Sequence, residues 1–149
     1  MPLRRGFSMV ELMLIIAIVG ILASISLPMV DDMRLRAKRA ELPGNVDGIM
    51  TAEVAYKVAH GRYLPIERFQ PDAQPGPAPR AWEGADFDQL GWAPAGQVRG
   101  SYAAYPATGG QGEQLGVHGI CDVDGNGDWS WWLATPTTPA HMVTVADEY

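Results

Sequence analysis

The chain has 149 residues, which is enough for one domain with a hydrophobic core and one appended element. It is acidic overall, with 17 Asp and Glu against 11 Lys and Arg. The charge is uneven, since residues 1–41 carry six basic and four acidic side chains and residues 42–149 carry five basic and thirteen acidic ones. Phosphate binding needs clustered Lys and Arg, so this balance excludes a general nucleic-acid-binding surface, and we expect no nucleic acid among the partners.

The first predicted element is an apolar helix over residues 7–30. Its 24 residues would reach roughly 36 Å, enough to cross a hydrocarbon core of about 30 Å. Pro28 is predicted to kink the helix near its far end, because proline has no backbone N–H to donate. One carboxylate, Glu11, lies inside the apolar run, and a charge at the centre of a bilayer costs about 2.5–3.5 kcal/mol on insertion scales.

Two ordinary explanations of this N-terminus leave Glu11 without a role. A cleavable signal peptide needs a short apolar core and a small-residue cleavage site, which Ser24 and Ser26 could supply. However, Glu11 interrupts the core, and the apolar run is longer than that of a typical signal peptide. A plain membrane anchor explains the length, and Arg4 and Arg5 favour a cytoplasmic N-terminus.

A third explanation uses Gly6, Phe7 and Glu11 together. If the chain is cut after Gly6, Phe7 becomes a new N-terminus with an α-amino group whose ordinary pKa is about 7.7–8.0. An ammonium and a carboxylate are each costly at membrane depth, but as a pair they offset one another. Phe7 and Glu11 are neighbours one turn apart on a helix. In helices packed with an axial stagger, Glu11 of one molecule could instead neutralise Phe7 of the next and set the register of an assembly.

The stretch RRGFSMVELMLIIAIVGILASISLP, residues 4–28, resembles the leader and first helix of the type IV prepilins, a family shared by pilus subunits and the pseudopilins of type II secretion. The likeness rests on a glycine before the cut, an aromatic residue after it, a Glu five residues into the mature chain and a later proline. It implies a leader of residues 1–6, cleavage between Gly6 and Phe7 by a prepilin peptidase, and N-methylation of Phe7 by the same enzyme. It also implies a long N-terminal helix whose distal half packs on an antiparallel sheet.

The charge pattern changes at DDMRLRAKRAE, residues 31–41, which is predicted to be a solvated helical surface just outside the membrane. Apolar residues at helical spacing predict an extension of the helix over residues 31–60, with one stripe buried against the distal domain. Glycine and proline disfavour a helix interior, so PGNVDG predicts a kink near residues 43–48. Gly61 and Pro65 are predicted to end the helix. The predicted buried stripe comprises Leu35, Leu42, Val46, Ile49, Met50, Val54 and Val58.

Residues 61–149 are predicted to form a loop-rich globular β domain, because most of the 17 Gly and 12 Pro residues lie after residue 60. Alternation predicts a strand over residues 97–105, and VHGIC and WSWWLATP read as two strands joined by a Gly- and Asp-rich turn. In the second of these strands, Trp129 and Trp131 share one face and Trp132 the other. We expect one of these faces in the core, with a subunit or carbohydrate contact as the alternative. The fold class is therefore α+β, a long N-terminal helix packed on a small antiparallel sheet.

The segment CDVDGNGD is the strongest local candidate for a metal site. Asp122, Asp124, Asn126 and Asp128 alternate along it, and hard oxygen ligands at this spacing suit Ca²⁺, the one cofactor that the sequence suggests. Leu133 stands where an EF-hand places its bidentate Glu, which argues against a true EF-hand. The alternative is a hairpin turn in which Asp and Asn cap backbone amides and Gly supplies positive φ.

No catalytic motif is recognisable, and His60, His118 and His141 are far apart in sequence, so we expect no enzyme. The single cysteine, Cys121, excludes an intrachain disulfide and is expected to be buried.

We expect a structural subunit of a type IV pilus-like filament, inserted in the inner membrane with a cytoplasmic N-terminus. Its expected partners are other pilin subunits, the prepilin peptidase and the assembly machinery, and the assembled filament would lie outside the cytoplasm. A type II secretion pseudopilin is the alternative within the family. A membrane-anchored calcium- or ligand-binding module that does not polymerise is the alternative outside it.

Overall fold

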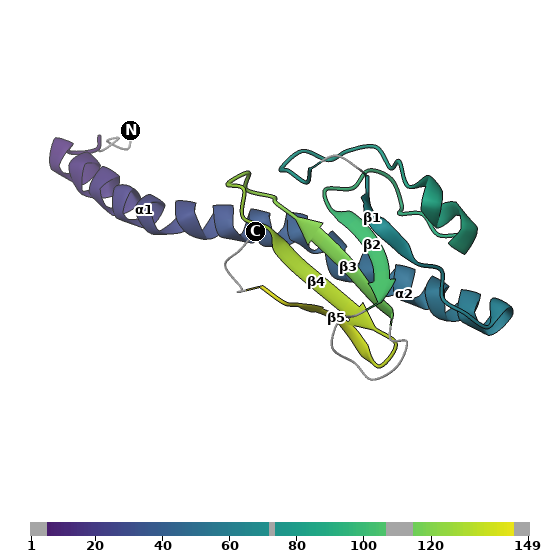
Figure 1. Ribbon diagram of the computed structural model, residues 1–149. Coiled ribbons are helices and arrows are strands. Elements are labelled where there is room, and N and C mark those ends of the chain that lie inside the picture. The colour runs from purple at the N-terminus through teal and green to yellow at the C-terminus, as the bar shows by residue number, and fades with distance from the viewer. Residues whose placement is uncertain (1–5, 72–73, 107–114, 145–149) are drawn as a thin grey trace, which may run out of the picture. The chain divides into compact units, whose positions relative to one another are not determined.

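The computed structural model describes residues 6–71, 74–106 and 115–144. It divides into two compact units, one up to Arg34 and one from Leu35 onward. The helices are α1 (Met9–Arg39), α2 (Glu41–His60) and the short 3₁₀ helix η1 (Ala85–Leu90). The strands are β1 (Ile66–Gln70), β2 (Ser101–Pro106), β3 (Leu115–Cys121), β4 (Ser130–Thr135) and β5 (Thr138–Met142) (Figure 1).

The two long helices follow one another with a single interruption at Ala40. Pro43 explains the position of this break, because it has no N–H to donate to the carbonyl of Arg39, four residues earlier, and its ring crowds that carbonyl. Pro43 itself lies in the first turn of α2, where a missing N–H is tolerated. The interruption thus falls ahead of residues 43–48, where the kink was expected, and those residues are helical. Pro28 lies inside α1, and the helix continues through it.

The second unit is built on a five-stranded antiparallel sheet with the strand order β1-β2-β3-β4-β5. Helix α2 packs against β3, β4 and β5 on one face of this sheet (Figure 1). The core between them contains Leu42, Val46 and Ile49 from the helix and Tyr102 and Val117 from the sheet, all fully buried. The α+β fold class predicted from the sequence is confirmed.

Two glycines allow close packing between α2 and its neighbours. A Cβ on Gly48 would lie 2.8 Å from Nε1 of Trp92, and a Cβ on Gly119 would lie 2.6 Å from Cγ2 of Val46. Real Cβ atoms essentially never make such contacts, so each glycine leaves room for the side chain packed on it. Gly48 therefore lies within a helix, against its low propensity, because an indole ring occupies the space beside it.

The predicted apolar stripe continues along α2 only as far as Met50. Val54 and Val58 are 40% and 84% exposed, and the buried position in their place is Glu53, at 0%. The reason is helix geometry. Glu53 lies seven residues after Val46, close to two full turns, and so shares its face of the helix, whereas Val54 is rotated away from that face. Gly61 ends the helix as predicted, with φ 76° and its N–H donating to the Lys57 carbonyl.

Three strands lie close to their predicted places, and two were not predicted. The expected strand over residues 97–105 begins at Ser101, and Val98 before it pairs with Arg80 in an isolated bridge. Strands β3 and β4 correspond to the two predicted around the Gly- and Asp-rich turn. The edge strands β1 and β5 are new.

Candidate functional site

The predicted processing point lies in a short non-helical stretch before α1. Gly6 and Phe7 precede the first helical residue, Met9, and both are exposed, Phe7 at 74%. No atom approaches within 4 Å of the place where a Cβ on Gly6 would lie. A peptide bond that is exposed and outside regular structure is open to proteolysis. The rest of the predicted leader, residues 1–5, lies outside the described residues.

Ser8 and Glu11 together form the N-terminal cap of α1. The Ser8 hydroxyl accepts a hydrogen bond from the Val10 N–H at 3.3 Å, and the Glu11 carboxylate accepts one from the Ser8 N–H at 3.0 Å. The Ser8 carbonyl accepts the first helical hydrogen bond, from the Leu12 N–H. This is a capping box, in which a Ser and a Glu three residues apart satisfy backbone donors that the helix leaves unpaired.

The capping box gives Glu11 a role that the sequence analysis missed. The Ser-x-x-Glu pattern at residues 8–11 is present in the sequence, whereas the charge of Glu11 by itself indicates only Phe7 as a partner. A carboxylate at the N-terminus of a helix is also favoured by the helix dipole. In the uncut chain Glu11 therefore stabilises the start of the helix.

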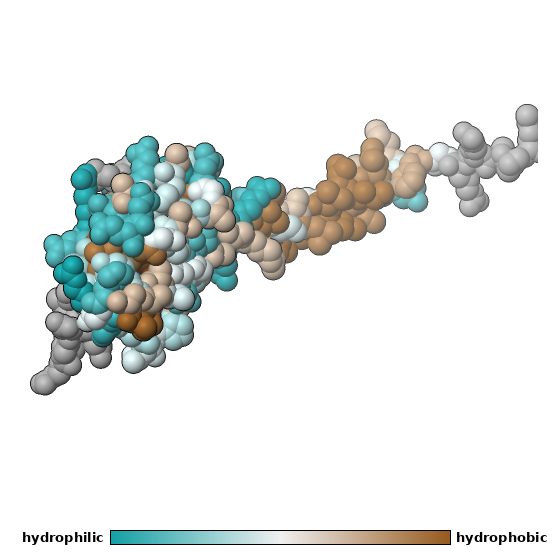
Figure 2. All heavy atoms as spheres, turned by 90° about the vertical axis from the view of Figure 1, so that its right-hand side faces the viewer, coloured by the Kyte–Doolittle hydropathy of each residue, from teal (hydrophilic) through white to brown (hydrophobic). Residues whose placement is uncertain are grey.

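Up to Met33, helix α1 presents an apolar surface that the described residues leave exposed. It contains no buried residue, and its large apolar side chains from Met9 to Met33 are between 42% exposed, at Val30, and 81% exposed, at Met9. Figure 2 shows this surface as continuous brown spheres along the helix. Among the described residues, one helical stretch, Met9–His60, is long and apolar enough to cross a membrane. An uncovered apolar surface of this extent needs a bilayer or other protein around it.

This segment matches known proteins in sequence. Residues 1–27 match the family described as the prokaryotic N-terminal methylation motif. In this segment the chain is therefore similar to proteins that carry this methylation motif. Proteins named as type IV major pilins and fimbrial proteins match the chain over 52 to 62 residues.

The type IV major pilin PilA of Myxococcus xanthus is 37% identical over 62 residues, which are 42% of this chain and 28% of that protein. The type IV major pilin PilE1 of Neisseria gonorrhoeae is 41% identical over 61 residues, which are 41% of this chain and 37% of that protein. A fimbrial protein of Moraxella nonliquefaciens is 44% identical over 52 residues, or 35% and 34% of the two chains. The chain thus spans about a third of the length of the relatives it matches. No solved structure matches it significantly.

The predicted calcium loop forms a turn in which the acidic side chains bind backbone amides. Asp122 is 6% exposed and accepts hydrogen bonds from the N–H groups of Gly125, at 2.7 Å, and Gly127, at 3.2 Å. The Asp124 carboxylate accepts hydrogen bonds from the backbone N–H and the side-chain amide of Asn126. The side-chain oxygen of Asn126 accepts one from the Asp128 N–H. Both glycines have positive φ, 79° and 92°. These contacts are those of the capped turn.

In this arrangement the loop offers no ready-made Ca²⁺ site, because the oxygens of Asp122 point at backbone amides. The described part of the chain also contains no group of three or more His, Cys, Asp or Glu that could hold a metal ion. Binding of Ca²⁺ here stays a prediction from the sequence.

An aromatic cluster lies on the face of the sheet opposite α2. Trp131 donates its indole N–H to Nδ1 of His118 at 3.1 Å, and the Tyr105 ring stacks on His118 with centroids 4.1 Å apart. Phe69 meets Trp131 edge-on, and burial lowers the pKa of His118 to about 4. Trp132 packs on the core instead, so Trp131 and Trp132 lie on opposite faces of β4 as predicted, whereas Trp129 lies before the first residue of this strand.

The remaining candidates are structural. His60 stacks on Tyr56 and His141 is exposed, so the three histidines do not form one site. Cys121 is fully buried, with its Sγ 2.9 Å from the Ser130 hydroxyl, and burial raises the pKa of its thiol to about 11. A thiol in this state behaves as a small hydrophobic side chain.

Proposed function

We propose that the chain is a structural subunit of a type IV pilus-like filament, held in the membrane by α1 and then assembled through it. One observation carries this proposal: residues 1–27 match an N-terminal methylation motif, and the apolar helix that begins within it contains no buried residue. A bilayer covers such a helix before assembly, and the same helices of other subunits cover it in a filament. The relatives that match are named major pilins and fimbrial proteins, which supports a structural rather than an enzymatic role.

Processing would change the partner available to Glu11. A prepilin peptidase that cuts after Gly6 creates an ammonium at Phe7, directly before the capping box and four residues before Glu11. In the uncut chain the Glu11 carboxylate accepts a hydrogen bond from the Ser8 N–H. After the cut it would also have the Phe7 ammonium as a charged partner, either on its own chain or on a neighbouring subunit. A charge-assisted hydrogen bond is about twice as strong as a neutral one, so the pair can fix the axial register of the subunits.

The variant Glu11→Gln separates the two roles of this side chain. Glutamine also completes a capping box, so the helix start is retained, whereas the charge pair with the Phe7 ammonium is lost. We expect the variant to be cleaved and inserted like the parent but to yield at least about tenfold fewer filaments, a loss that corresponds to about 1.4 kcal/mol. Filaments sheared from cells are quantified by electron microscopy and immunoblotting.

The matched control is Ser8→Ala, which removes the hydroxyl cap but keeps the Glu11 charge. It is expected to assemble at near-parental levels. Normal assembly of Glu11→Gln would refute the charge-pair role, and intact mass of the membrane protein tests the processing itself. Loss of residues 1–6 with one added methyl group supports the proposal, and an uncut chain overturns it. Surface fibres distinguish a pilus from a secretion pseudopilus, whose loss would block protein secretion.

A further inference from the structure

Glu53 is a carboxylate that the fold places inside the core. It lies on the sheet-facing side of α2 with an exposed fraction of 0%. Its Oε2 accepts a hydrogen bond from the Leu64 N–H at 3.0 Å, whereas its Oε1 is buried and has no hydrogen-bond partner among the described residues. A buried carboxylate with one unsatisfied oxygen is costly when charged and much less so when protonated.

The hydrogen bond from Leu64 holds the connection between α2 and β1, residues 61–65. At its start, this connection leaves the helix through the left-handed Gly61. In its middle, the Lys57 ammonium lies 4.2 Å from the centre of the Tyr63 ring. At its end, the Leu64 N–H reaches into the core to Glu53. The connection thus depends on a buried side chain at the point where it becomes the edge strand β1.

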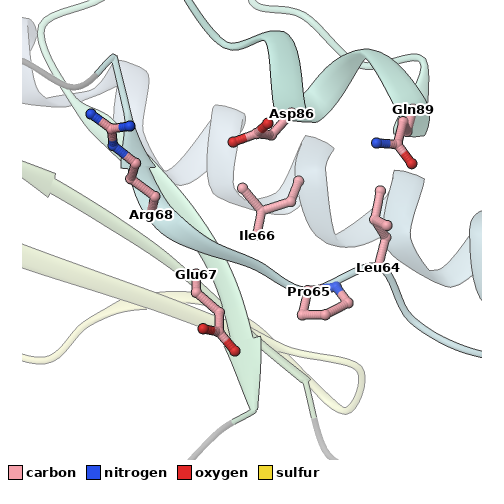
Figure 3. Close-up of a pocket in the computed structure, with 7 residues that line it drawn as sticks. All are labelled: Leu64, Pro65, Ile66, Glu67, Arg68, Asp86 and Gln89. Carbon is pink, nitrogen blue, oxygen red and sulfur yellow. The ribbon is translucent and has the colours of Figure 1, made fainter.

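The same connection forms one wall of a pocket of about 330 Å³. Figure 3 shows Leu64, Pro65 and Ile66 along the strand side, with Asp86 and Gln89 of η1 opposite them. The side chains of Gln70 and Asp86 are hydrogen-bonded and tie the two walls together at the far end of β1. At the near end, the Glu53 carboxylate binds the backbone N–H of Leu64, which belongs to this wall.

Within the described part of the chain, no charged or titratable group is hydrogen-bonded to the Oε1 of Glu53. On α2, Asp47 binds the Ala140 N–H, Lys57 lies over Tyr63 and His60 stacks on Tyr56. Tyr102 of β2 accepts a hydrogen bond from the Asn45 side-chain amide, and Cys121 and His118 of β3 contact Ser130 and Trp131. The exposed groups are Glu67 and Arg68 of β1, Asp86 and Asp88 of η1, and His141 of β5.

We propose that Glu53 is a pH-operated latch, which holds the α2–β1 connection and the adjoining pocket wall closed when its carboxyl is protonated and releases them when it ionises. In the closed form the neutral carboxyl accepts the Leu64 N–H and needs no counter-charge. In the ionised form a charge lies in a dry site with one hydrogen bond, and opening of residues 61–65 admits water to Oε1. Burial raises the pKa of Glu53 to about 7, against the smaller opposing effect of the Leu64 N–H, which places the transition near neutral pH.

Hydrogen exchange of the Leu64 amide in the full chain, held in detergent micelles, tests the latch. After correction for the intrinsic pH dependence of exchange, we expect the protection of Leu64 to fall by at least about tenfold between pH 5.5 and pH 8.5, because the closed form binds a proton that the open form releases. In Glu53→Gln, which keeps a carbonyl acceptor for Leu64 and cannot ionise, the protection should not change with pH. In Glu67→Gln, which removes an exposed acid from β1, the parental response should remain.

The carboxyl itself provides a second measurement that needs no variant. The side-chain carboxyl resonance of Glu53 in the ¹³C-labelled parent should titrate near pH 7, together with the amide resonance of Leu64. Titration near 4.5, the ordinary value, would overturn the proposal, as would a Leu64 protection that does not depend on pH or a pH response in Glu53→Gln equal to the parental one.

Discussion

Burial is the main cause of the pKa shifts of both Glu53 and His118, and its effect differs in sign for an acid and a base. The pKa of Glu53 rises from 4.5 to about 7, so between these pH values the folded protein binds more protons than the unfolded chain. Acidification through this window therefore stabilises the fold. The pKa of His118 falls from 6.5 to about 4, so acidification from pH 6.5 to pH 4 favours the unfolded chain, whose histidine charges more readily.

The two effects oppose one another between about pH 4.5 and pH 6.5. A variant that removes one titrating group should therefore show the pH dependence caused by the other. We expect Glu53→Gln to lose roughly 1–3 kcal/mol of unfolding free energy on acidification from pH 6.5 to pH 4.5, because only the His118 effect is left. His118→Gln should gain a similar amount over the same interval. Urea unfolding at each pH, followed by tryptophan fluorescence in micelles, measures both. Parallel pH profiles for the two variants would contradict these assignments.

Single side chains were the hardest features to predict from the sequence. Glu53 breaks the rule that acids face solvent, and only the register of α2 against the sheet places it inside. The role of Asp122 could be predicted as one of two alternatives, because a turn cap and a metal ligand require the same residue types. The capping box at Ser8 and Glu11 is encoded in a local Ser-x-x-Glu pattern, but it was not predicted, because the charge of Glu11 also fits a pair with an ammonium at Phe7.

At the scale of elements, prediction succeeded where one local signal dominated. The apolar helix, the Gly61 cap and the turn between β3 and β4 each have a strong pattern. Strands β1 and β5 are five residues long, lie at the two edges of the sheet and have prolines beside or within them, Pro65 and Pro139. Short strands with proline do not show a clear alternation, and proline is itself a feature of edge strands, where a missing N–H costs no ladder bond.

The glycines of α2 can be told apart by what lies beside them. Trp92 faces Gly48, and its ring also contacts the rings of Trp82, Phe87 and Tyr102. The indole therefore has little space into which it could move. We therefore expect Gly48→Ala to destabilise the protein by roughly 1–2 kcal/mol, since overpacking outweighs the gain in helix propensity. The matched control is Gly44→Ala, where nothing lies within 4 Å and a gain of about 0.5–1 kcal/mol is expected. Urea unfolding measures both, and a stabilised Gly48→Ala would show that Trp92 moves aside.

At the scale of the whole molecule, the buried core belongs entirely to the unit that begins at Leu35. Every buried apolar residue among those described lies at or after Leu42, and α1 contributes none. The first unit thus carries the uncovered apolar helix surface, and the second contains the buried core. In the proposed filament subunit, this division would allow the helix to be covered by lipid in one state and by protein in another without unfolding of the domain.

The division predicts that the domain keeps its stability without the first unit. A chain that begins at Leu35 should need no detergent and should unfold within about 0.5 kcal/mol of the full chain in micelles, because no buried contact is removed. A chain that begins at Glu41 is the matched control. It also lacks Leu35, which packs on the core, and should lose about 1 kcal/mol or more. Urea unfolding followed by the fluorescence of the core tryptophans compares the three. A loss above 2 kcal/mol in the Leu35 chain would mean that α1 stabilises the domain, and the separation of assembly from folding would fail.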